Sequence, residues 1–186
     1  GIGDTLPLTI DISNDKGQVL VFELNFSLDD FIFSKKDGFD LVELKEGLFL
    51  DKAGEPKLPV KGINIALPSG MKVVNLKVSV LEEEMVPGKY LIYPVQPDQK
   101  TIFYEGESES EGEPGFINPR PDIYSSPQDY PIEGGRLITS GFLSGYPICG
   151  IEVYPFKYIP AQQKLILHNK VELTMTLEKV TEEISF

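Results

Sequence analysis

One long stretch near the C-terminal end alternates apolar and polar residues with a period of two. Between Leu165 and Leu177 the apolar positions are Leu165, Leu167, Val171, Leu173, Met175 and Leu177. Successive side chains of a strand point to opposite faces, so this pattern predicts a long strand with one buried face and one wet face. His168 falls on the face that is expected to be wet.

The same alternation recurs in shorter segments. Residues 74–80 repeat it, and further strands are expected at 8–13, 19–26, 63–67, 90–93, 101–104, 136–143 and 148–154. The only short helix candidates are 28–33 and 41–46. With 17 Gly and 15 Pro available for turns, so many short strands predict an all-β fold, an antiparallel β-sandwich with a jelly-roll-like arrangement.

The chain is expected to form one domain over residues 1–186, because 186 residues can bury a core without disulfides or metals. Residues 104–131 break the alternation, since they are acidic at first and then rich in proline. Loops of this length are usually functional or disordered. We therefore expect a long, irregular, exposed loop within the single domain.

Composition excludes several classes of function. The net charge of -12 would repel a phosphate backbone, and the 17 Lys and Arg residues are scattered, so nucleic acid is not an expected partner. No apolar run approaches the roughly 18 residues of a membrane span. A single cysteine, Cys149, rules out an internal disulfide and a multi-cysteine metal site.

The sequence contains no arranged catalytic group. A thiolate and imidazole pair would need Cys149 and His168, and nothing in their spacing places the base within hydrogen-bond reach of the nucleophile. We expect a packed cysteine, a surface histidine, no catalytic residue and no cofactor. Weak calcium binding by Glu105, Glu107 and Glu109 is an alternative to a solvated acidic run, which lacks the Asp and Gly spacing of a tight calcium loop.

Three blocks, in this order, resemble the propeptide domain that precedes the catalytic domain of gingipain-type cysteine peptidases. They are GEPKLPVKGINIALPSGMKV from Gly54, YLIYPVQP from Tyr90 and VYPFKYIPAQQKLILHNKVELTM from Val153. The prolines of these blocks suit edge strands and bends. The resemblance lies in the order and spacing of the blocks, because none of them is a catalytic signature.

The resemblance implies a non-catalytic domain that inhibits a cysteine peptidase, assists its folding and is then removed by proteolysis. The catalytic domain of that peptidase would lie downstream of Phe186 and would be the partner of this domain. The resemblance also implies a bacterial precursor that is secreted or held at the cell surface. The start of the chain lacks the features of a signal peptide, which would then lie upstream.

The irregular loop offers a candidate for the inhibitory contact. Arg120 is one of two arginines and lies in the sequence NPRPD, where Asn118, Pro119, Pro121 and Asp122 would frame it. The bond after Arg120 leads into proline, and flanking prolines stiffen a presented segment. We expect Arg120 to enter the primary pocket of an arginine-preferring peptidase, the alternative being a solvated loop residue.

Two alternatives remain open at the level of sequence. If the peptidase prefers lysine, Lys100 replaces Arg120 as the candidate. The chain could instead be a stand-alone β-sandwich binding module for carbohydrate or protein, attached to a surface or secreted enzyme. Its eight tyrosines would then include an exposed patch that stacks on sugars.

Overall fold

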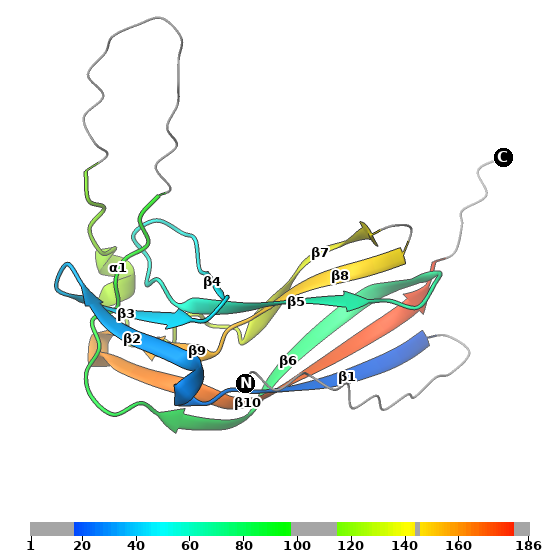
Figure 1. The fold of residues 1–186 in the computed structure, drawn as a ribbon, viewed down its shortest axis with the longest axis horizontal. Coiled ribbons are helices and arrows are strands. Elements are labelled where there is room, and N and C mark those ends of the chain that lie inside the picture. Colours follow the sequence, from blue (N-terminus) through cyan, green and yellow to red (C-terminus); the bar gives the residue numbers. More distant parts are fainter. Residues whose placement is uncertain (1–16, 98–114, 144–145, 181–186) are drawn as a thin grey trace, which may run out of the picture.

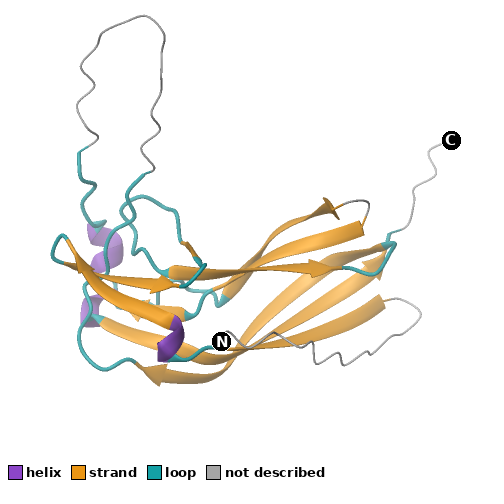
Figure 2. Ribbon diagram, in the orientation of Figure 1, coloured by secondary structure: helices purple, strands orange, loops and turns teal. Residues whose placement is uncertain are grey.

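A computed structural model describes residues 17–97, 115–143 and 146–180. Within these ranges the regular structure is mainly antiparallel strands, as Figure 2 shows, and the all-β prediction is confirmed. The strands are β1 (Gly17–Asn25), β2 (Phe31–Lys36), β3 (Phe39–Leu44), β4 (Leu48–Phe49), β5 (Pro59–Ala66), β6 (Met71–Met85), β7 (Gly135–Leu143), β8 (Tyr146–Val153), β9 (Phe156–Ile159) and β10 (Lys164–Lys179).

Three short helical turns accompany these strands. They are the 3-10 turns η1 (Leu28–Asp30) and η2 (Pro160–Gln162) and the helix α1 (Pro121–Tyr124). In Figure 1, α1 lies at the end of the molecule where β10 begins, and Ala161 N donates to Ser126 O there. The predicted strands at residues 8–13 and 101–104 lie outside the described residues.

The long strands form two layers, which Figure 1 shows one above the other. One sheet has the order β1-β10-β6, with β9 also paired to β10, and the other has the order β4-β5-β8-β7. The two long sheets face each other across one core, and the hairpin β2-β3 adds Phe31, Val42 and Leu44 to it. These strand orders are compatible with a jelly-roll-like arrangement.

Strand β10 is the centre of its sheet. It pairs along one edge with β9 and then β1, and along the other edge with β6. The predicted inward face is confirmed, because the six apolar residues on this face are all 0% exposed; they are Leu165, Leu167, Val171, Leu173, Met175 and Leu177.

The prediction that His168 lies on a wet face is wrong. His168 is 5% exposed, and the link between β8 and β9 lies against the strand at this point. His168 N donates to Pro155 O at 2.8 Å, and its Nδ1 lies 2.9 Å from Tyr154 O. Irregular pairing between His168 and Lys170 also breaks the strict alternation.

The prediction of a helix at residues 41–46 is also wrong. These residues belong mainly to β3, which pairs with β2 from Phe31↔Leu44 to Lys36↔Phe39. The connecting residues Asp37 and Gly38 both have positive φ, 52° and 84°. Asp-Gly is a preferred pair for the two-residue hairpin turn that needs two positive φ angles. This local signal defines the hairpin better than the helical interpretation did.

The aromatic residue Phe156 is fully buried in the core, with its ring centroid 4.6 Å from that of Phe31. Phe156→Ala should lower the free energy of unfolding by about 3–5 kcal/mol, because it removes buried apolar surface and leaves a cavity. Urea denaturation measures this loss. Leu81→Ala, at a position 49% exposed, is the control and should change stability by about 0.5 kcal/mol or less. Equal losses would contradict this packing.

His168, the single histidine of the chain, should make stability depend on pH. Burial lowers the pKa of His168 below its ordinary value of 6.5, so the unfolded chain binds the extra proton first as pH falls. Stability therefore decreases as pH falls from about 6.5 towards the lower, folded pKa. Glu83, Lys157 and Asp129 are the charged groups that act on His168.

Comparison with His168→Gln isolates this effect, since other titrating groups are common to both proteins. Urea denaturation at about pH 7.5 and about pH 5.5 should show that the stability of the parent relative to the variant is greater at the higher pH. A difference that is the same at both pH values would contradict the buried neutral histidine.

Candidate functional site

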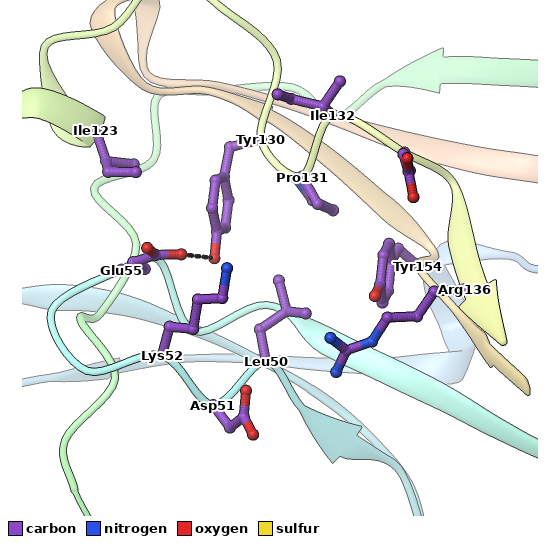
Figure 3. A pocket seen from close by; sticks show the side chains of 11 residues that line it. Leu50, Asp51, Lys52, Glu55, Ile123, Tyr130, Pro131, Ile132, Arg136 and Tyr154 are labelled. Atoms are coloured by element: carbon purple, nitrogen blue, oxygen red, sulfur yellow. Dashed lines mark hydrogen bonds between the residues drawn. The ribbon is translucent and has the colours of Figure 1, made fainter. Parts of the chain in front are cut away.

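A buried carboxylate organises the region where the predicted inhibitory residues lie. Glu55 follows β4 and is 6% exposed. Its two oxygens have different donors, since Tyr130 Oη donates to Oε2 at 2.8 Å and Arg120 Nη1 donates to Oε1 at 2.8 Å. Figure 3 shows the Tyr130 contact at the edge of a hollow. A buried charge is tolerated when it is paired and hydrogen-bonded in this way.

Arg120 itself lies immediately before α1 and is bound by a second carboxylate. Its Nε donates to Asp122 Oδ1 at 3.3 Å and its Nη2 donates to Asp122 Oδ2 at 2.6 Å. This hydrogen bonding raises the pKa of Arg120 and lowers the pKa of Asp122. The side chains of Arg120 and Asp122 are 47% and 62% exposed, whereas that of Glu55 is 8% exposed. The guanidinium therefore joins a buried carboxylate to an exposed one.

Backbone hydrogen bonds hold the same residues together. Gly54 N donates to Val95 O, Val95 N donates to Glu55 O, and Arg120 N donates to Gly54 O, at 2.8–2.9 Å. Gly54 has a φ of 77°, and a Cβ at this position would lie 3.1 Å from Arg120 Cγ and 3.2 Å from Asn118 O. Glycine is therefore required here both for its conformation and for the close approach of the second chain segment.

The side chain of Gln96 adds a further connection between the two segments. Its Nε2 donates to Ile117 O at 2.9 Å, while Ile117 N donates to its Oε1 at 2.8 Å. One amide side chain thus forms the pair of hydrogen bonds that a neighbouring strand would otherwise supply. These two hydrogen bonds hold the segment that carries Gln96 next to the segment that carries Ile117.

Glu55 and Tyr130 also line a hollow of about 440 Å³. Its apolar lining includes Leu50 and Ile132, and Lys52 and Arg136 supply positive charge. Figure 3 shows Tyr130 and Tyr154 on its wall, with Lys52 and Arg136 extending into it from opposite directions.

A second arginine and glutamate pair borders this hollow. Arg136 Nε donates to Glu152 Oε2 at 2.8 Å, and Tyr154 Oη lies 3.5 Å from the same oxygen. The exposed fraction of the Arg136 side chain, 48%, is close to the 47% of Arg120. The two arginines of the chain therefore occupy comparable settings, which makes each a control for the other.

The structure brings together part of the predicted site. Asn118, Pro119, Arg120, Pro121 and Asp122 are described, with Pro121 as the first residue of α1. Lys100, Glu105, Glu107 and Glu109 lie outside the described residues. Among the residues that are described, no group of three or more His, Cys, Asp or Glu side chains could hold a metal ion.

Cys149 and His168 are not arranged as a nucleophile and base. Cys149 is fully buried in β8, and His168 lies in β10 of the other sheet. Burial raises the pKa of the Cys149 thiol, which disfavours the reactive thiolate. The imidazole Nδ1 lies 2.9 Å from the backbone oxygen of Tyr154. The expectation of a packed cysteine is confirmed.

The described tyrosines do not form an exposed stacking surface. Tyr90, Tyr124 and Tyr130 are half-buried, whereas Tyr93, Tyr154 and Tyr158 are buried. Several donate their hydroxyls to the protein itself, as Tyr124 does to Ile92 O at 2.6 Å and Tyr158 to Tyr90 O at 2.8 Å. The tyrosine patch expected of a carbohydrate-binding module is not formed by these six side chains.

Comparison with known proteins places the chain in a family. The family model Propeptide_C25 matches residues 12–185. The chain belongs to the Propeptide_C25 family. It is thus the non-catalytic propeptide part of a cysteine peptidase precursor, and the predicted resemblance is confirmed. No curated protein matches the chain.

Two solved structures share the fold of this Propeptide_C25 domain. One comes from a study of the zymogenic latency of gingipain K of Porphyromonas gingivalis. It has a TM-score of 0.65 and 17% sequence identity, and the match covers 95% of this chain and 99% of the chain in that structure. The other is the complex of the pro- and mature domains of Porphyromonas gingivalis RgpB. It has a TM-score of 0.63 and 16% sequence identity, and the match covers 98% of this chain and 88% of the chain in that structure.

Sequence reasoning singled out Arg120 and Asp122 but not Glu55 or Tyr130. Glu55 lies in the block that begins at Gly54, and Tyr130 is one of the eight tyrosines. Their separations from Arg120 in sequence give no periodic signal, because the contact joins three different connections of the fold. The one local signal is Gly54 before Glu55, which marks a tight turn.

Tyr130→Phe should lower the free energy of unfolding by about 1–3 kcal/mol, since it removes a hydrogen bond to a buried charged group. Thermal and urea denaturation measure the loss. Tyr90→Phe is the matched control, because Tyr90 Oη donates to the exposed backbone oxygen of Pro87, and it should cost about 1 kcal/mol or less. If Tyr130→Phe were as mild as its control, the buried hydrogen bond would not stabilise the fold.

Proposed function

We propose that this domain inhibits the cysteine peptidase of its own precursor, assists the folding of that peptidase and is released by proteolysis. Membership of the Propeptide_C25 family supports this proposal. The complex of pro- and mature domains described for RgpB, whose fold this chain shares, is a precedent for association of such a domain with a mature domain. The cognate partner is accordingly the peptidase domain that follows in the precursor.

The inhibitory contact that we propose uses Arg120 in the primary specificity pocket of an arginine-preferring peptidase. Support comes from the half-exposed side chain of Arg120 and from its place between Pro119 and Pro121, which restrict the backbone on both sides. The hydrogen bond from Arg120 N to Gly54 O also fixes this backbone before a partner binds, which reduces the entropy lost on binding.

The frame of Arg120 also accounts for inhibition without turnover. The bond after Arg120 is an imide to Pro121, which lacks the N–H of an ordinary peptide leaving group. Asn118, Pro119 and Asp122 complete the presented segment. Lys100 takes the place of Arg120 if the partner prefers lysine.

We also propose that the precursor is secreted or held at the cell surface of a bacterium, as expected of gingipain-related propeptides. No helix in the described part of the chain is long and apolar enough to cross a membrane.

Arg120→Ala should raise the inhibition constant for the cognate peptidase by about a hundredfold or more, because a basic side chain that fills a pocket is a dominant contact. Cleavage of a fluorogenic peptidyl-arginine substrate in the presence of the 186-residue domain measures the inhibition constant. A peptidyl-lysine substrate identifies the pocket preference and so decides between Arg120 and Lys100.

Arg136→Ala is the matched control, since it removes the other arginine at nearly the same exposure and also breaks a pair with a glutamate. It should inhibit like the parent. An Arg120→Ala domain that inhibits as well as the parent would refute the pocket assignment. Absence of inhibition by the parent domain would refute the inhibitory function as a whole.

A further inference from the structure

In the free domain the guanidinium of Arg120 is already bound to two carboxylates of its own chain. It forms three hydrogen bonds, one to Glu55 and two to Asp122. A specificity pocket for arginine would supply acceptors of the same kind. Because bidentate contacts between arginine and a carboxylate depend on alignment, the same N–H groups cannot serve both sets of acceptors.

The two internal acceptors differ in strength. Asp122 is 62% exposed, so its attraction to Arg120 is screened by water, whereas the side chain of Glu55 is 8% exposed. Charge pairs away from solvent interact more strongly than exposed ones, and removal of one partner leaves a costly buried charge. Glu55 is therefore the acceptor that opposes the departure of Arg120 more strongly.

If the guanidinium of Arg120 left Glu55, the buried carboxylate would still have a hydrogen-bond donor. The hydroxyl of Tyr130 donates to the other carboxylate oxygen at 2.8 Å and does not depend on Arg120. Lys52 lines the same hollow as Glu55, and Figure 3 shows its amine directed towards the hydrogen bond between Glu55 and Tyr130. A second positive charge thus lines the hollow that holds the carboxylate, which makes the exchange of Arg120 feasible.

We infer that Glu55 is an internal competitor for Arg120 and sets how readily this side chain is released to the pocket of a partner. The inference rests on the proposed function, because it takes Arg120 as the pocket residue. Glu55 lowers the affinity of the free domain for the peptidase by stabilising the unbound position of Arg120. A conformation that binds a partner is reached only at the cost of this contact.

The position of the backbone is independent of this competition. Arg120 N remains bonded to Gly54 O, and Gln96 remains paired with Ile117. Only the side chain of Arg120 has to change its partners. Neutralisation of Glu55 should therefore free the guanidinium without displacing the segment that presents it.

The test replaces Glu55 by its neutral isostere in the 186-residue domain. Glu55→Gln should lower the inhibition constant for the cognate peptidase by about three- to tenfold, the range that one partly buried pair contributes. Asp122→Asn should lower it by about threefold or less, because exposed pairs contribute less. Because Asp122 is exposed, Asp122→Asn is expected to fold even if Glu55→Gln does not. A lower inhibition constant for Asp122→Asn would then support competition of internal carboxylates for Arg120.

Glu152→Gln is the matched control. It neutralises the partner of Arg136, again beside a tyrosine, and should leave the inhibition constant unchanged. An inhibition constant that stays the same or rises in both Glu55→Gln and Asp122→Asn would overturn the inference. A fall of equal size in Glu152→Gln would also overturn it, since the effect would then reflect overall charge.

Chemical labelling tests the internal contact without a peptidase. Phenylglyoxal modifies accessible guanidinium groups, and mass spectrometry follows Arg120 and Arg136 separately in one sample. Glu55→Gln should accelerate labelling of Arg120 relative to Arg136 by about threefold, and Glu152→Gln should have the opposite effect on the ratio. An unchanged ratio in Glu55→Gln would overturn the role of Glu55 alone, whereas undiminished inhibition by Arg120→Ala would refute the pocket assignment on which it rests.

Discussion

The pairing of β10 along both of its edges is the constraint on which the rest of the fold depends. Each backbone N–H and C=O of a buried strand needs a partner, and β1, β6 and β9 supply these partners over the length of β10. One face of the same strand provides six buried apolar residues to the core cluster. The second sheet and the β2-β3 hairpin then cover the apolar face that β10 and its neighbours create.

The end of the sandwich that carries α1 is held together by polar contacts instead of apolar burial alone. Connections that are distant in sequence meet at Glu55, where a buried carboxylate accepts from Arg120 and Tyr130. Apolar burial is non-directional, so it favours a compact end without fixing which groups meet there. Hydrogen bonds are directional: those to the Glu55 carboxylate define where the guanidinium of Arg120 lies, whereas the bond from Arg120 N to Gly54 O and the pairing of Gln96 with Ile117 hold the segment that carries it.

The sequence was sufficient to predict what depends on local pattern. The alternation that ends at Leu177 predicted β10 and its buried face because the strand period is two. It did not predict the burial of His168, since the covering link at Tyr154 and Pro155 comes from tertiary structure. The helix prediction at 41–46 failed because helical and strand periods are difficult to distinguish in so short a segment. The Asp37-Gly38 pair, which favours a hairpin turn, was the more decisive signal.

The pairing of Gln96 with Ile117 has a consequence for how domains of this type can diverge. Both ends of the intervening chain are held by the same two hydrogen bonds, so the scaffold does not depend on how many residues lie between them. The entropy of closing a flexible loop rises slowly, by about 0.6 kcal/mol for each doubling of its length. We therefore expect the sandwich to tolerate insertions and deletions between these two anchors, so that related precursors can differ there in length and composition.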